Sequence, residues 1–128
     1  MTSTGQSVAQ RRAAVVKALK AGGAKARKGR LRLPVGELFW YLDTRVEGLG
    51  SSARLLLEVG CWTPQLPPEP EGGAVDCPLL VDVALDDDAA DVAALLAQLR
   101  EIGDLGTLRD HLDGFPDALV DKALRELL

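Results

Sequence analysis

Residues 38–62 read LFWYLDTRVEGLGSSARLLLEVGCW and contain two runs in which apolar and polar side chains alternate. A third run of this kind covers residues 79–85. Successive side chains of a β-strand point to opposite faces, so the alternation predicts a sheet with one apolar face and one more polar face. The expected long strands cover residues 38–47, 53–62 and 79–85. Short loops between alternating strands favour an antiparallel meander.

The alternation also assigns side chains to the faces and edges of this sheet. Leu57 and Val81 fall on the apolar face, so we expect them in the core, whereas Leu56 falls on the more polar face. Residues 31–35 alternate as well, but Pro34 has no backbone N–H to donate. This strand is therefore expected to be short or to lie at an edge.

The N-terminal third predicts one helix followed by a basic connector. Capping-box spacing occurs twice, in Ser3–Gln6 and in Ser7–Gln10, and each pattern is typical of a helix start. Residues 22 and 23 are glycines, which end helices readily because they have no Cβ atom. We expect residues 24–30 to form the connector. The apolar face of the helix is expected to contain Val8, Val15, Val16 and Leu19.

The C-terminal third predicts further helices. Residues 86–88 are three aspartates, and acidic residues favour a helix N-terminus because its unpaired N–H groups are electropositive. A short helical turn is expected around Leu108 and Leu112, and Pro116 is suited to the first position of a last helix. The helix that follows residues 86–88 has an expected core stripe of Val92, Leu95, Leu96, Leu99 and Ile102. The last helix has an expected stripe of Leu119, Val120, Ala123, Leu124 and Leu127.

These elements predict an α+β fold. We expect one antiparallel sheet of about four strands, with an N-terminal helix and two or three C-terminal helices packed on one face. With 128 residues and 47% hydrophobic content, the chain is long and apolar enough for a substantial core. We therefore expect residues 1–128 to form one domain. Residues 1–6 are expected to be frayed.

Charge is unevenly distributed along the chain. Residues 1–32 contain nine bases and no acid, whereas the remaining residues contain six bases and all 19 acids. Such asymmetry favours either a basic arm for an anionic partner or an acidic surface for a basic partner. A third interpretation is that the two parts neutralise each other in the folded chain, and we regard it as the simplest.

Catalytic and metal-binding motifs are not evident in the sequence. His111 is the single histidine and is expected at the surface, and the cysteines Cys61 and Cys77 lack the spacing of a zinc site. Residues 86–91 lack the ligand pattern of a calcium loop, and no glycine-rich phosphate motif occurs. We therefore expect no catalytic residue, metal or cofactor. No secretory signal or membrane span is recognisable, so we expect a cytoplasmic protein with reduced cysteines and no membrane partner.

The proline-rich segment after residue 62 is the main candidate for partner binding. Trp62 is expected on the more polar face beside this long loop, where it could be exposed or packed beneath the loop. An aromatic side chain beside a rigid loop is a common arrangement in protein interfaces. The candidate partner-binding residues are Trp62, Pro67, Pro68, Glu69 and Glu71. The alternative, an anion-binding or nucleic-acid-binding site, would use Lys25, Arg27, Lys28 and Arg30 within the basic segment 11–32.

The order of these segments resembles a small bacterial domain of unknown function, family 4304. The resemblance rests on the glycine-terminated helix LKAGGAK (19–25), followed by ELFWYLDTR (37–45), LLLEVGCW (55–62) and CPLLVDV (77–83). It implies an α+β fold without an established activity, and some members of that family resemble immunity proteins, which bind and block a toxin. The leading hypothesis is therefore a non-enzymatic protein-binding domain, immunity-like or antitoxin-like, whose acidic surface binds a basic protein. The alternative hypothesis is nucleic-acid binding by residues 11–32.

Overall fold

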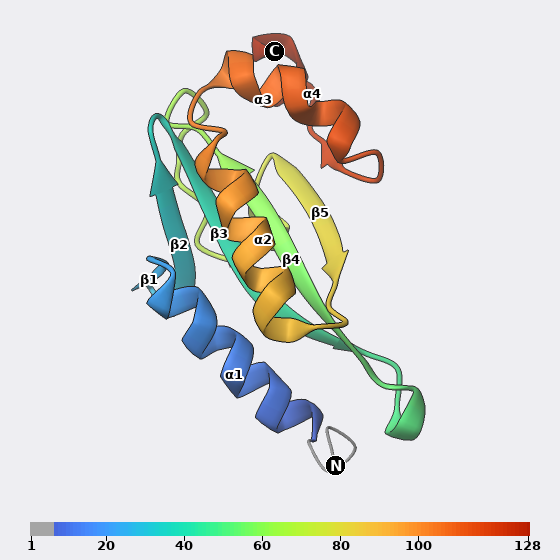
Figure 1. The fold of residues 1–128 in the computed structure, drawn as a ribbon. Coiled ribbons are helices and arrows are strands. Elements are labelled where there is room, and N and C mark those ends of the chain that lie inside the picture. The colour runs from blue at the N-terminus through green and yellow to red at the C-terminus, as the bar shows by residue number, and fades with distance from the viewer. Residues whose placement is uncertain (1–6) are drawn as a thin grey trace.

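The computed structural model describes residues 7–128 and shows an antiparallel sheet with helices against one face (Figure 1). The α+β class and the single antiparallel sheet are confirmed, but the sheet has six strands and not about four. The strands, in spatial and sequence order, are β1 (Lys25–Arg27), β2 (Arg30–Val35), β3 (Leu38–Glu47), β4 (Arg54–Trp62), β5 (Leu79–Ala84) and β6 (Leu119–Val120). The helices are α1 (Val8–Ala21), α2 (Asp88–Arg100), α3 (Leu105–His111) and α4 (Lys122–Leu127).

Helices α1 and α2 lie side by side across one face of the sheet (Figure 1). Ser7 and Gln10 form the expected capping box of α1, and Asp87 caps α2 through its side chain. The expected spacing from Ser3 to Gln6 and the expected fraying of residues 1–6 lie outside the described residues. All five residues of the predicted α2 stripe are buried against the apolar face of the sheet, which forms the main core.

The predicted basic connector is in part a strand. Residues 24–30 were expected to be irregular, but Lys25–Arg27 pairs with Arg30–Arg32 as β1. Lys28 and Gly29 form the turn with positive φ angles of 51° and 80°. Positive φ at both central residues is typical of the tight turns whose twist matches a hairpin. The strand that contains Pro34, β2, is therefore not the edge strand that was expected, because β1 pairs with its first half; β1 does not extend to Pro34, whose missing N–H costs no hydrogen bond on that side.

The last helix begins later than predicted. Pro116 does not start a helix; instead Leu119 and Val120 form β6 beside β5, and α4 begins at Lys122. The Asp121 N–H donates to the Pro78 carbonyl over 2.7 Å, so the edge of β5 provides hydrogen bonds that a helix at this point would forgo. Tertiary pairing therefore overrides the apolar periodicity of this segment.

Leu57 and Val81 are buried as expected, with exposed fractions of 0% and 7%. Leu56 is also only 6% exposed, so the expectation of a wetter environment for this side chain is wrong. Its cross-strand neighbours are Arg45 and Ala84.

We expect the Leu57→Ala substitution to lower the free energy of unfolding by about 2–5 kcal/mol, because it leaves a cavity in the core. Urea denaturation measures this loss. Leu49→Ala is the matched control, since Leu49 is 88% exposed in the β3–β4 hairpin and its truncation removes little packing. Equal losses for the two variants would contradict the placement of Leu57.

Candidate functional site

The second face of the sheet is covered in part by the proline loop, which we define as residues 63–78 between β4 and β5. The loop and the sheet together form a small apolar cluster, which the sheet separates from the main core. Its buried members are Tyr41, Trp62, Ala74 and Cys77, and Phe39 and Leu80 pack beside them.

Gly60 provides the space in which the proline loop contacts β4. A Cβ atom at this position would lie 2.7 Å from the Ala74 carbonyl oxygen and 2.7 Å from the Cys77 Sγ atom. Real Cβ atoms essentially never approach backbone so closely. The absence of a side chain at Gly60 therefore allows the loop to lie directly on the sheet.

Trp62 anchors the proline loop from below. Its side chain is 7% exposed, and its indole N–H donates to the Leu66 carbonyl over 2.8 Å. The Phe39 ring lies 5.4 Å from the Trp62 ring, centroid to centroid. Of the two arrangements that the sequence left open for Trp62, the structure has the one in which it packs beneath the loop. It offers almost no surface to a partner.

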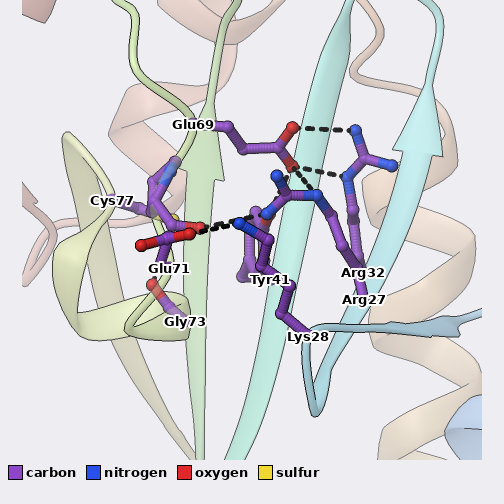
Figure 2. Close-up of polar contacts among 9 residues, drawn as sticks. Arg27, Lys28, Arg32, Tyr41, Glu69, Glu71, Gly73 and Cys77 are labelled. Atoms are coloured by element: carbon purple, nitrogen blue, oxygen red, sulfur yellow. Dashed lines mark hydrogen bonds and ion pairs between the residues drawn. The ribbon is translucent and has the colours of Figure 1, made fainter.

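Glu69 connects the proline loop to three strands (Figure 2). Arg32 on β2 brings its Nε atom to 2.7 Å from one carboxylate oxygen, and its terminal nitrogen donates to the other oxygen over 3.1 Å. Arg27 on β1 lies 3.6 Å away, and the Tyr41 hydroxyl on β3 donates to the same carboxylate. The Arg32 guanidinium also stacks over the Phe39 ring at 4.0 Å. Glu69 therefore already pairs with Arg27 and Arg32, the cations that an external anion would use.

The other predicted loop residues are more exposed. Pro67 and Pro68 are exposed and joined by a cis peptide bond, and Glu71 forms an ion pair with Lys28 at the surface (Figure 2). The structure thus brings Glu69 and Glu71 together with the hairpin of β1 and β2, and among residues 7–128 no aromatic side chain is exposed.

The predicted anion-binding residues are mostly engaged in ion pairs. Arg27 pairs with Glu69, Lys28 with Glu71, and the Arg30 guanidinium lies 4.0 Å from Asp43. Lys25 is exposed and forms no ion pair with residues 7–128. The interpretation in which the two charge regions neutralise each other therefore describes this part of the fold.

The single histidine and the two cysteines make contacts that serve the fold. The His111 Nδ1 atom lies 2.8 Å from the Thr107 carbonyl oxygen, and the side chain is partly buried in α3. Cys61 on β4 lies in the main core, whereas Cys77 belongs to the proline loop and is buried against the second face of the sheet; both are free thiols. Burial raises the pKa of the Cys61 thiol far above its usual value and raises that of Cys77 to about 12. Both thiols are therefore protonated at neutral pH and poorly nucleophilic.

No cluster of three or more histidine, cysteine or acidic side chains within residues 7–128 is arranged to hold a metal ion. Over the same residues, no helix combines the length and the hydrophobicity that crossing a membrane requires. A hollow of about 930 Å³ lies between α1, the β3–β4 hairpin and the start of α2. Arg11 and Asp88 pair across it at 2.8 Å.

Acidic residues without partners concentrate in the last part of the chain. Residues 79–128 contain twelve acids and four bases. Only Asp82, Asp88 and Asp110 lie within ion-pair distance of a base among the described residues. A groove of about 520 Å³, lined by four aspartates, runs along the outer edge of β5 here. Sequence reasoning missed this groove because it expected Pro116 to begin a helix, whereas residues 115–118 are not helical and line the groove in part.

The chain matches no protein-family model, no curated protein and no solved structure. The family resemblance stated above therefore stays a prediction.

We expect Gly60→Ala to destabilise the fold by about 1–3 kcal/mol, because the added methyl group overpacks the contact between β4 and the proline loop. Thermal or urea unfolding measures the loss. Gly114→Ala is the control, since a Cβ atom there meets nothing within 4 Å. An unchanged stability of Gly60→Ala would show that the loop does not pack on β4 at this point.

Tyr41 is the single tyrosine, so phenolate absorbance reports its ionisation alone. Burial, followed by the hydrogen bond to Glu69, raises its pKa to about 12 from the usual 10.0. The unfolded chain then loses this proton before the folded chain does, so stability falls as pH rises from 10 towards 12. We expect Glu69→Gln to lower the Tyr41 pKa in an absorbance titration. A pKa near 10 in the unmodified protein would contradict the buried contact.

Proposed function

We propose that this chain is a non-enzymatic protein-binding domain whose acidic C-terminal segment binds a basic protein partner. The observation that carries the proposal is the set of unpaired acids in residues 79–128. Of twelve acidic side chains, nine have no cation of residues 7–128 within ion-pair distance, and most of these nine are exposed. Complementary charge speeds the encounter of two proteins and selects between partners.

The basic segment supports this proposal indirectly. Of its nine bases, five are within ion-pair distance of acids of the same chain: Arg11, Arg27, Lys28, Arg30 and Arg32. A phosphate group would have to displace these carboxylates before it could bind. The ion pairs disfavour nucleic-acid binding by residues 11–32, and they leave the acidic segment as the main uncompensated charge.

The proposed partner is a protein, and the proposed location is the cytoplasm. A basic toxin, which an immunity-like protein would block, is one partner with suitable chemistry. The high pKa of both thiols and the structural contact of His111 give no support to a nucleophile or a general base. The function therefore rests on surface charge and shape.

Affinity capture from a nuclease-treated lysate tests the proposal. The triple variant Glu101→Gln/Asp113→Asn/Asp117→Asn removes three exposed acids, and Lys17→Gln/Lys20→Gln/Lys25→Gln removes three exposed bases as the matched control. We expect the unmodified protein and the lysine variant to retain a basic protein, and the acidic variant to retain at least tenfold less, because attraction between exposed charges at physiological salt acts over about 8 Å. Capture that requires nucleic acid, or that only the lysine variant loses, would favour the nucleic-acid hypothesis.

A further inference from the structure

The outer edge of β5 is only partly covered. β6 pairs with Leu79 and Leu80, and β5 has no neighbouring strand among the described residues along Val81–Ala84 on that side. In Figure 1, β5 lies at the border of the sheet. Uncovered edges present unpaired backbone groups and are the usual place where an extended peptide adds to a sheet.

The direction of the free backbone groups follows from a hydrogen bond at the end of β5. The Leu85 N–H donates to the Leu55 carbonyl over 3.3 Å and so points towards β4. Backbone groups of an antiparallel strand alternate in direction, so those of Asp82 and Ala84 point away from β4. Both residues are exposed. Two N–H groups and two carbonyl groups therefore face the uncovered edge.

A groove accompanies this edge and has an apolar centre. It encloses about 520 Å³ between β5, α2 and residues 114–117. Val81, Leu95 and Phe115 line it, each less than 9% exposed. A strand added at this edge would direct alternate side chains into the groove.

The two ends of the groove are acidic. Asp117 lies at the end near Leu80, since these two residues also line an adjoining hollow. Asp86 lies at the other end, two residues beyond β5, together with Asp91. Among residues 7–128, no lysine, arginine or histidine lines the groove, although Asp82 pairs with Arg45 on the second face. The pattern of charges along the groove is thus acidic, apolar, acidic.

We propose that the groove beside Val81–Ala84 binds an extended basic segment of a partner protein as an added β-strand. The matching segment has the pattern basic–x–apolar–x–basic, because residues i, i+2 and i+4 of a strand share one face. Its apolar side chain occupies the centre of the groove, and its two bases face Asp117 and Asp86. This inference rests on the proposed function and names the surface and the partner segment.

The probe is a fluorescein-labelled peptide with the sequence Thr-Lys-Thr-Val-Thr-Lys-Thr, whose binding is followed by fluorescence anisotropy. We expect a Kd below about 1 mM. Two modified peptides carry N-methyl groups, one on the lysines and valine and the other on the threonines. Only one of these sets of amides faces β5 in a strand, so one methylated peptide should bind at least tenfold more weakly and the other normally. A peptide with glutamate in place of lysine should not bind.

Protein variants locate the binding site. Ala84→Pro removes an outward N–H that no strand of the described chain uses, and proline is tolerated at such edges. Asp117→Lys reverses an exposed charge at one end of the groove, and Glu126→Lys on α4 is the charge-matched control. We expect at least tenfold weaker peptide binding for the first two variants and unchanged binding for the control. Hydrogen exchange of the Asp82 and Ala84 amides should slow in the peptide complex.

Three results would overturn the proposal. The first is no saturable binding of the peptide, and the second is equal binding of both methylated peptides, which would indicate attraction by charge alone. The third is a dimer that Ala84→Pro converts to a monomer, which would place a second copy of this chain on the edge. Capture of a basic protein that is insensitive to Ala84→Pro would leave the proposed function intact and reject only the strand addition.

Discussion

A sheet with helices against one face needs another cover for its second face, and here the cover is a loop that the Glu69 carboxylate joins to three strands. Glu69 lies against Arg32, Arg27 and the Tyr41 hydroxyl, so it joins the proline loop to β1, β2 and β3. A partly buried carboxylate is stable only when charged or polar groups compensate it, and these three partners do so. That compensation is the polar counterpart of the apolar contacts that Trp62 and Gly60 make with the same loop.

The same contact determines which charges remain available at the surface. Arg27 and Arg32 point towards Glu69 in the loop. Lys28 likewise pairs with an acid of the loop, Glu71. The two basic residues nearest Glu69 serve the fold, and the acids of residues 79–128 have no comparable set of partners. The uneven distribution of charge along the sequence therefore produces an uneven distribution on the surface, where the uncompensated charge is negative.

Periodicity predicted the regions where one physical effect dominates. The core stripe of α2 follows the helical period, and the three long strands follow the alternation of apolar and polar residues. In both cases burial of the apolar side chains is the dominant effect. The hairpin at Lys28 and Gly29 was missed because its first strand, β1, is short and basic. Likewise, composition identified Glu69 as a candidate but not its partners. Arg32 is 37 residues away from Glu69 in the sequence, and spacing carries no information about such contacts.

The missed β6 strand explains why the edge of β5 remains open. Leu79 pairs with Val120 and Leu80 with Leu119, so an extension of β6 in the same register would place Asp117 directly opposite Asp82. Like charges at directly opposed positions destabilise a strand pair. The chain turns away before this point, with the Ala118 N–H donating to the Phe115 carbonyl over 3.0 Å. Asp117, which disfavours a continuation of β6 along β5, is also one of the two acids that would face the bases of an added strand, so the same side chain bears on both the gap and its selectivity.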